Sequence, residues 1–155
     1  MRTGIGYDIH RLVPGRPLVL GGVEIDYEQG LLGHSDADVL LHALCDAMLG
    51  AAALGDIGRH FPDNDPAWKD ASGKTLLEKT WLMVSGKFDS VVNIDATVFA
   101  QEPKLLPYMD AMANSISGCL GIGKERVNIK ATTTEGLGVI GRGSAMAAMC
   151  VVLLE

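Results

Sequence analysis

The sequence is poor in aromatic residues and contains only three cysteines. Aromatics make up 5% of the 155 residues, so the core is expected to consist of small aliphatic side chains. The cysteines, Cys45, Cys119 and Cys150, are odd in number, lie far apart and form no C-x-x-C pair. Neither a disulfide framework nor a cysteine-rich zinc site is indicated, and a reducing compartment is expected.

Basic runs and long apolar runs are also absent. Lys and Arg total 13 against 19 Asp and Glu, which gives a formal net charge of −6. Nucleic acid and anionic membrane surfaces are therefore not expected as partners. No apolar run reaches the ~18–20 residues of a membrane span. The first residues, MRTGIGYDIHRL, lack the apolar stretch of a signal peptide.

The residues that are present suffice for one compact domain over residues 1–155. Hydrophobic residues make up 48% of the chain, and the mean hydropathy is +0.21. This positive hydropathy, with so few bulky side chains, favours a buried subunit interface in addition to a core.

Apolar periodicity and turn residues predict alternating strands and helices. The predicted strands are residues 2–12, 91–100, 127–133 and 145–154, with a hairpin over 16–26. The predicted helices are 35–53, opened by a capping box of Ser35 and Asp38, then 72–87, and one from Pro103 or Pro107 to Gly121. Residues 54–66 and the glycine-rich stretch 135–143 are predicted to be loop and turn. This order predicts an α/β (α+β) sandwich, with a mixed four-stranded sheet, helices packed on one face and a small hairpin.

Asp8, His10 and His42 form a candidate metal site. Asp8 and His10 are two residues apart in a strand, so their side chains leave the same face. His42 lies on the polar stripe of a predicted helix, between Asp38 and Asp46. Together with one exogenous oxygen, the three would make an open, catalytic type of zinc site. The alternative is a solvent-facing strand edge and an exposed helix histidine.

Three other segments could bind a polar or anionic ligand. His34 and Ser35 stand where a helix is predicted to begin, and free backbone N–H groups there favour phosphate; ordinary capping explains Ser35 equally well. The loop Gly55–Asp65 suits hydroxyl recognition or a lid, or is a surface turn. Thr132, Thr133, Thr134 and Glu135 could hold phosphate oxygens and a hard cation, or simply close a strand.

Four segments taken together resemble one family. They are GYDIHRL, GLLGHSDADVLLHALCDAMLGAAALGDIGRHFPDNDP, AQEPKLLPYM and VNIKATTTEGLG, which follow one another along essentially the whole chain. The chain is similar to the 2-C-methyl-D-erythritol 2,4-cyclodiphosphate synthases of the non-mevalonate isoprenoid pathway. The resemblance implies a homotrimer of α/β subunits with active sites at the subunit interfaces.

The implied substrate is 4-diphosphocytidyl-2-C-methyl-D-erythritol 2-phosphate, a cytidine diphosphate-linked small molecule. Its 2-phosphate attacks the β-phosphorus, closes the cyclic diphosphate and releases CMP. The nucleophile belongs to the substrate, which accounts for the lack of a protein nucleophile or triad in the sequence. Catalysis would then rest on positioning and charge stabilisation.

The resemblance also implies roles for individual residues. Asp8, His10 and His42 would hold Zn²⁺, which would polarise the phosphoryl group under attack. Glu135 would hold Mg²⁺ or Mn²⁺ bridging the α- and β-phosphates, and His34 and Thr133 would stabilise the transition state. The implied contacts to the methylerythritol phosphate are Ser35, Asp56, Ile57, Gly58, Phe61, Pro62, Asp63, Asn64 and Asp65. The cytidine pocket on the neighbouring subunit would be formed by the segment from Ala100 to Leu106, which includes Lys104 and Leu105, and by Ala131, Thr132 and Thr133. Thr134, Val139 and Arg142 complete the implied binding positions.

The family also has a cavity along the trimer axis that can hold an isoprenoid diphosphate. Tyr7, Val139 and Ser144 differ there from the residues common in the family, which are Phe at the first position, an aromatic residue at the second and, in some members, Glu at the third. The lack of a recognisable targeting segment leads us to expect the bacterial cytoplasm, or the plastid stroma if this is a processed chain.

Two other functions fit part of the pattern. A zinc phosphohydrolase would use a metal-bound hydroxide and a base such as Asp38 or Asp56, and would leave a linear product. A non-catalytic trimeric module would only bind isoprenoid diphosphates in its central cavity.

Overall fold

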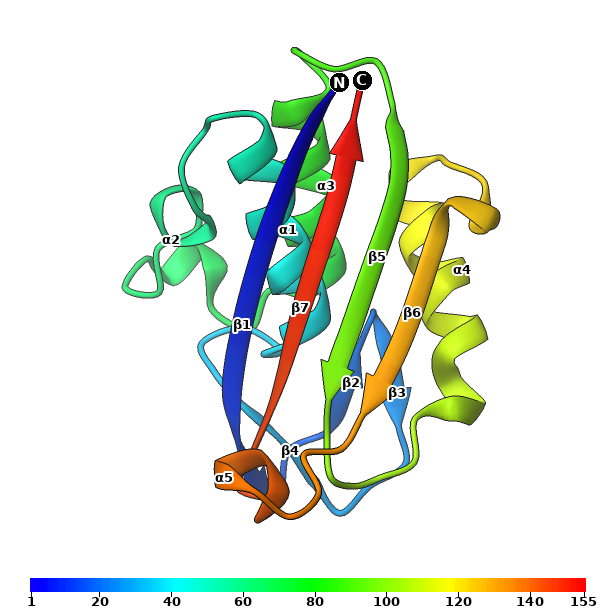
Figure 1. Ribbon diagram of the computed structural model, residues 1–155. Helices are drawn as coiled ribbons and strands as arrows, with labels where there is room; N and C mark the ends of the chain where they lie inside the picture. The colour runs from blue at the N-terminus through cyan, green and yellow to red at the C-terminus, as the bar shows by residue number, and fades with distance from the viewer.

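The computed structural model describes residues 1–155 as a five-stranded sheet with its long helices against one face (Figure 1). The strand order is β4-β1-β7-β5-β6, with β5 and β6 parallel and the other neighbours antiparallel. The strands are β1 (Arg2–Pro14), β2 (Leu18–Leu20), β3 (Val23–Ile25), β4 (Gln29–Leu32), β5 (Val91–Phe99), β6 (Val127–Thr132) and β7 (Ala145–Leu154). The helices are α1 (Val39–Ala51), α2 (Ile57–His60), α3 (Gly73–Val84), α4 (Met109–Leu120) and α5 (Gly138–Gly141), with 3₁₀ turns at Pro66–Trp68, Leu106–Tyr108 and Lys124–Arg126.

The α/β sandwich, the mixed sheet and the separate β2–β3 hairpin are confirmed, but the prediction of four strands in the sheet was wrong. The fifth strand is β4, which pairs antiparallel with the end of β1 and places Leu31 opposite Leu12. Its four residues are too few to show an alternating pattern. Gly30 weakens the strand signal further, and it is needed because an added Cβ would overlap the backbone carbonyls of Arg16 and Pro17.

Helix α1 begins four residues later than predicted. Its N-cap is Asp38, not Ser35, and the predicted capping box of Ser35 and Asp38 does not form. Ala37, just before the cap, has φ +58°, a conformation that ends any helix running back to Ser35. The Asp38 side chain is fully buried and accepts the N–H groups of Leu40 and Leu41. It also accepts those of Gly21 and Gly22, so it ties the β2–β3 hairpin to α1.

Two short helices occupy segments that we predicted to be irregular. α2 lies within the predicted loop 54–66, where Asp56 caps it, and α5 lies within the glycine-rich stretch 135–143. Each has four residues, too few for an apolar period to appear in the sequence.

A single cluster of 35 buried hydrophobic residues fills the space between sheet and helices, and it consists mainly of Leu, Ala, Val, Ile and Met, as expected. Helix α1 is at its centre, packed directly on β1. This approach depends on Gly4 and Gly6, because a Cβ at either would overlap the carbonyl oxygens of Ala47 or Ala43 in α1. No helix is long and apolar enough to cross a membrane.

Candidate metal centre and adjoining pockets

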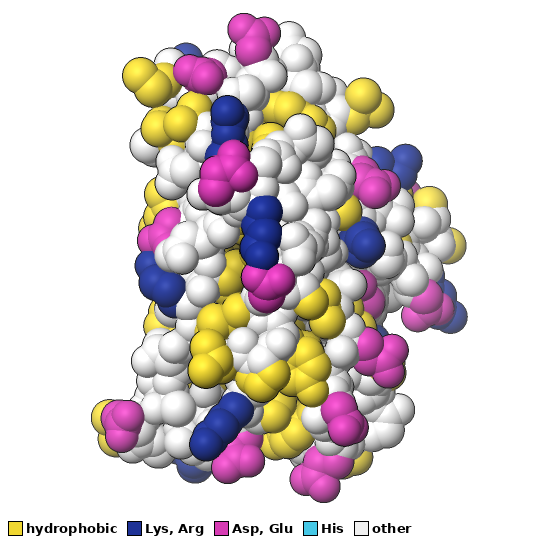
Figure 2. All heavy atoms as spheres, turned by 90° about the vertical axis from the view of Figure 1, so that its right-hand side faces the viewer, with side chains coloured by type: hydrophobic (Ala, Val, Ile, Leu, Met, Phe, Trp, Pro, Cys, Tyr) yellow, Lys and Arg dark blue, Asp and Glu magenta, His cyan; other side chains and the backbone are white.

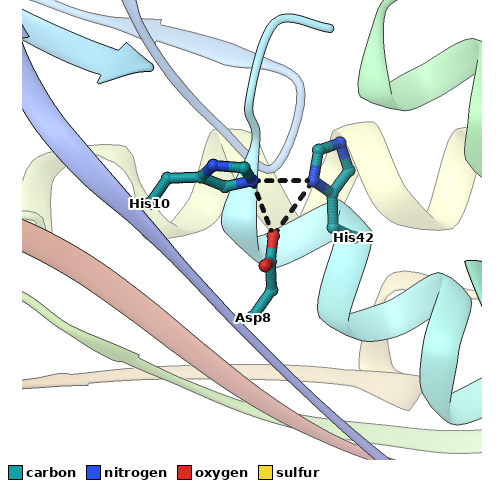
Figure 3. A group of neighbouring side chains, drawn as sticks. All are labelled: Asp8, His10 and His42. Atoms are coloured by element: carbon teal, nitrogen blue, oxygen red, sulfur yellow. Dashed lines mark hydrogen bonds and ion pairs between the residues drawn. The ribbon is translucent and has the colours of Figure 1, made fainter. Parts of the chain in front are cut away.

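Asp8, His10 and His42 meet at the junction of β1 and α1 (Figure 3). Asp8 and His10 project from the helix-facing side of β1, as their two-residue spacing predicts. His42 projects toward them from the first turns of α1. Asp8 Oδ2 lies 3.1 Å from His10 Nε2 and 3.0 Å from His42 Nδ1, and these two nitrogens lie 3.4 Å apart.

This triangle has the dimensions of a tetrahedral metal site. Ligands at about 2.0–2.1 Å from a zinc ion in tetrahedral geometry lie roughly 3.3 Å from one another. The second nitrogen of each imidazole has its own partner: His10 Nδ1 pairs with the Leu32 carbonyl at 2.9 Å, and His42 Nε2 pairs with Ser35 Oγ at 3.1 Å. A carbonyl only accepts, so His10 Nδ1 donates, and in the neutral imidazole the lone pair of Nε2 faces the centre. The three residues therefore fit a divalent metal.

The ionisation of Asp8 and that of His10 are linked. Burial alone would raise the pKa of Asp8, but hydrogen bonds from His10 and His42 outweigh it and hold this pKa well below its usual range. Burial would lower the pKa of His10, yet the hydrogen bond to Asp8 raises it overall. Asp8 therefore stays ionised, as a metal ligand must.

The three residues line a pocket of about 540 Å³. Eight of the other predicted site residues also line it: His34, Ser35, Ile57, Gly58, Phe61, Pro62, Asp63 and Asn64. Five lining residues are missing from the predicted contacts: Tyr7, Gly33, Asp46, Trp68 and Leu76. Asp46 could have been found, because it continues the helix stripe of Asp38 and His42 by one turn. Trp68 and Leu76 carry no polar signal that would distinguish them from core residues.

The predicted cytidine residues line a second pocket, of about 280 Å³, between the ends of β5 and β6 and the start of α4. Its lining includes Ala100, Lys104, Leu105, Leu106, Ala131, Thr132 and Thr133, together with Gln101 and Pro103 of the same predicted segment 100–106. Met109 also lines it and was not predicted for this role. Figure 2 shows the side of the molecule that carries β6 and α4; hydrophobic side chains gather in its lower half, with charged ones around them.

The remaining predicted residues, Asp56, Asp65, Thr134, Glu135, Val139 and Arg142, line neither pocket. The backbone carbonyl of Asp65 nevertheless pairs at 3.3 Å with Nε2 of His34, which lines the first pocket. Glu135 is exposed and accepts a hydrogen bond from Thr133 Oγ1 at 3.0 Å, which links it to the second pocket. It does not join the Asp8, His10 and His42 group. The two pockets share no residue within one chain.

The fold and the site together define a class: α/β sandwich proteins with a candidate metal site of one carboxylate and two imidazoles in the lining of a pocket. Comparison with known proteins narrows it. The model of the YgbB family matches residues 1–155, and the chain belongs to this family. It is 59% identical over 155 residues, all of both chains, to the 2-C-methyl-D-erythritol 2,4-cyclodiphosphate synthase of Desulfatibacillum aliphaticivorans. It is 60% identical over 154 residues to that of Moorella thermoacetica, covering 99% of this chain and 94% of the relative.

Solved structures agree with this assignment. A 2-C-methyl-D-erythritol-2,4-cyclodiphosphate synthase in its CDP-bound form matches with a TM-score of 0.91 and 37% identity, over 99% of this chain and 100% of that one. The bifunctional IspDF of Campylobacter jejuni matches with a TM-score of 0.93 and 47% identity, over 97% of this chain and 41% of that one. The activity is that of a 2-C-methyl-D-erythritol 2,4-cyclodiphosphate synthase, a lyase of the non-mevalonate isoprenoid pathway.

Proposed function

We propose that the chain closes the cyclic diphosphate by an intramolecular attack within 4-diphosphocytidyl-2-C-methyl-D-erythritol 2-phosphate. An oxygen of the 2-phosphate forms a bond to the β-phosphorus, and the bond from this phosphorus to the bridging oxygen breaks. CMP leaves with that oxygen. The observation that carries the proposal is the Asp8, His10 and His42 triangle in the lining of the larger pocket. The enzyme then contributes placement and charge stabilisation, which dominate catalysis of phosphoryl transfer.

Asp8, His10 and His42 would hold Zn²⁺, because one carboxylate and two neutral imidazoles that leave a fourth position open suit that ion. When bound, the ion supplies Lewis-acid polarisation of a phosphoryl oxygen. His10 and His42 each present one nitrogen to the centre and pair the other with the protein, which fixes the planes of both rings.

Ser35 and His34 would contact the substrate from the same pocket. Ser35 Oγ accepts the N–H of Ala37 at 3.1 Å and pairs with His42 Nε2. When His42 Nε2 donates, both lone pairs of the Ser35 oxygen are used, so its own proton is free for a phosphate oxygen. His34 stabilises the charge of the transition state from the rim of the pocket. Asp56, Ile57, Gly58 and Phe61, Pro62, Asp63, Asn64 and Asp65 contact the methylerythritol end.

Thr133 and Glu135 would act on the diphosphate from the second pocket. The hydrogen bond between their side chains supports a shared role. Glu135 holds Mg²⁺ or Mn²⁺, a hard cation suited to carboxylate and phosphate oxygens. Thr133 donates to a phosphoryl oxygen, and Thr134, Val139 and Arg142 border this end of the substrate.

The second pocket would receive the cytidine. The CDP-bound relative supports this choice of ligand. Within one chain, the second pocket and the pocket of the metal ligands share no residue. The active site would therefore form where the second pocket of a neighbouring copy meets the pocket of the metal ligands.

The surface that would bring copies together is the sheet face opposite α1, α3 and α4. Ile5, Tyr7 and Ile9 project from it at alternate positions of β1, with 64%, 50% and 41% of their surface exposed. Met149 and Val151 stand beside them on β7, paired with Tyr7 and Ile5. A continuous apolar patch of this kind marks an interaction surface. We assign it to a homotrimer, whose axial cavity would admit an isoprenoid diphosphate.

Residues 1–155 act as one domain, and the bacterial relatives support the bacterial cytoplasm over the plastid stroma.

The metal centre is tested by His42→Ala, with His60→Ala as the matched control. His60 is a second half-buried histidine whose Nε2 pairs with the Leu54 carbonyl, outside the metal group. We expect His42→Ala to lose bound zinc and at least a thousandfold in CMP release, and His60→Ala to retain both. Full synthase activity of His42→Ala would refute the metal assignment, and a linear phosphate product from the unchanged protein would indicate a hydrolase instead.

A further inference from the structure

Arg16 lies outside both pockets but contacts the segment that borders the metal centre. It belongs to the turn between β1 and β2. Its guanidinium Nη2 donates to the backbone carbonyl of Ser35 at 3.0 Å. Ser35 stands in the chain between β4 and α1, 19 residues further on. The contact therefore joins the turn that follows β1 to the segment that follows β4.

The surroundings of Arg16 fix it in place. The β4 backbone approaches Arg16 and Pro17 so closely at Gly30 that no side chain fits there. The guanidinium Nε is buried and has no hydrogen-bond partner. A buried N–H without an acceptor destabilises a fold. A contribution to stability alone therefore does not explain the arginine at this position. An unpaired buried group of this kind is a reason to look for a functional role.

The turn that Arg16 contacts is strained. Ala37, two residues after Ser35, has φ +58°, a conformation that residues with a side chain rarely adopt. Asp36 anchors the middle of the turn by accepting the N–H groups of Gly73 and Asp38, at 2.7 and 3.2 Å. The peptide group between Ser35 and Asp36 is held at both ends: its carbonyl accepts from Arg16, and its N–H donates to the Ala71 carbonyl at 3.1 Å.

Ser35 connects the anchored turn to His42 through a side-chain hydrogen bond. Its hydroxyl oxygen accepts the Ala37 N–H and meets His42 Nε2 at 3.1 Å. A shift of the Ser35 backbone moves this oxygen, and with it the ring whose Nδ1 faces Asp8. We propose that Arg16 is a positioning residue of the metal centre, which acts through Ser35 to hold the His42 imidazole in its ligating orientation. This inference rests on the proposed metal centre.

The test measures metal binding rather than turnover. Zn²⁺ affinity is obtained by competition with a chromophoric chelator, and the geometry of the centre from the visible absorption of the Co²⁺ form. The variants are Arg16→Met, Arg16→Lys, Ser35→Ala and the double variant Arg16→Met with Ser35→Ala. The matched control is Arg126→Met, which removes an arginine that also donates to a backbone carbonyl, that of Val91 at 3.1 Å. Val91 lies far from the metal centre. It pairs with Leu154, which in turn pairs with Arg2, and Arg2 is about 20 Å along β1 from Asp8.

We expect Arg16→Met and Ser35→Ala each to weaken Zn²⁺ binding roughly tenfold, the size of effect typical of partners that orient metal ligands. Both should change the Co²⁺ spectrum. Arg16→Lys keeps a cationic donor and should fall between Arg16→Met and the unchanged protein. The double variant should be no weaker than Ser35→Ala, because both changes act on the same contact. Arg126→Met should match the unchanged protein in affinity and spectrum.

Three results would overturn the inference. If Arg16→Met leaves the Zn²⁺ affinity and the Co²⁺ spectrum unchanged, the inference about Arg16 is refuted, while the proposed metal centre is not. Fully additive losses in the double variant show that Arg16 does not act through Ser35. If the unchanged protein binds no Zn²⁺, or if His42→Ala binds Zn²⁺ as tightly as the unchanged protein, the proposed metal centre is refuted and this inference with it. The thermal unfolding midpoint of each metal-free variant separates loss of fold from loss of geometry.

Discussion

At the scale of the residue, His10 links proton binding to metal binding. Its hydrogen bond to the Asp8 carboxylate raises its pKa above 6.5, although burial acts the other way. A proton on His10 excludes a metal from Nε2, so the proton competes from a higher pH than at an ordinary histidine.

We therefore expect Zn²⁺ affinity to weaken steadily as pH falls from 8 to 5, with the loss beginning above pH 6.5. Chelator competition at a series of pH values measures it. In Asp8→Asn the carboxylate that raises the pKa of His10 is gone, so affinity should be lower throughout and proton competition should begin at a lower pH. An affinity that is constant across this range would contradict the role of His10 as a ligand.

The residues of the centre could be predicted from the sequence because their chemistry is visible in it. The two-residue spacing of Asp8 and His10 places them on one face, and the helix stripe includes His42. Their meeting could not be derived, because it depends on how closely α1 lies on β1. Ser35 illustrates the limit: the sequence favours it as a helix cap, whereas in the structure its hydroxyl contacts His42.

At the scale of the element, the position of α1 depends on the Asp38 carboxylate. It is fully buried and accepts four backbone N–H groups, two from α1 and two from the β2–β3 hairpin. Ser72 caps α3 in the ordinary way, with one exposed hydrogen bond to the Thr75 N–H.

Replacing each cap by alanine should separate these two roles. Asp38→Ala leaves four backbone donors, three of them buried, without an acceptor and should lower the free energy of unfolding by on the order of 3 kcal/mol or more. Ser72→Ala should lower it by about 1 kcal/mol. Urea unfolding of the metal-free proteins measures both. Equal losses would show that Asp38 is only a helix cap.

The contact between α1 and β1 can be tested through a glycine. A Cβ at Gly6 would overlap the Ala43 carbonyl, so Gly6→Ala must push α1, which carries His42, away from the strand that carries Asp8. We expect lower stability and at least tenfold weaker Zn²⁺ binding, since a metal site tolerates little displacement of its ligands.

Gly118→Ala is the control for this change. Gly118 is exposed in α4, with open space where a Cβ would stand. Alanine there should raise the free energy of unfolding by roughly 0.5–1 kcal/mol and leave Zn²⁺ binding unchanged. Unfolding curves and chelator competition on the same samples compare the two variants. Unchanged Zn²⁺ affinity in Gly6→Ala would contradict the dependence of the centre on this contact.

Most elements could be predicted because their periodicity or turn residues are strong, and the exceptions share a physical reason. β4, α2 and α5 have four residues each, so local preference hardly marks them and tertiary contacts decide. The start of α1 is set by the burial of Asp38 and the positive φ of Ala37. Both depend on parts of the chain outside the predicted helix.

At the scale of the whole molecule, alternation along β1 serves two purposes. Asp8 and His10 face the helices and the pocket, while Ile5 and Ile9 face outward on the uncovered side of the sheet. The proposed metal ligands and the exposed apolar patch therefore lie on opposite faces of one strand.

Charging the uncovered face should separate the copies. Val151→Glu places a carboxylate in the apolar patch beside Ile5, and burying it would carry a large desolvation cost. We expect sedimentation analysis to show trimers for the unchanged protein and monomers for this variant. Leu82→Glu, at an isolated leucine on α3 that is 76% exposed, should stay trimeric. A trimeric Val151→Glu protein would place the interface elsewhere.

The most direct test of the proposed reaction is a ³¹P NMR time course of the purified protein with 4-diphosphocytidyl-2-C-methyl-D-erythritol 2-phosphate, with and without EDTA. We predict the appearance of the paired signals of a cyclic diphosphate together with CMP, and the loss of both when EDTA removes the metal. A linear phosphate product, or cyclic product formed at an unchanged rate in EDTA, would contradict metal-dependent cyclisation at Asp8, His10 and His42.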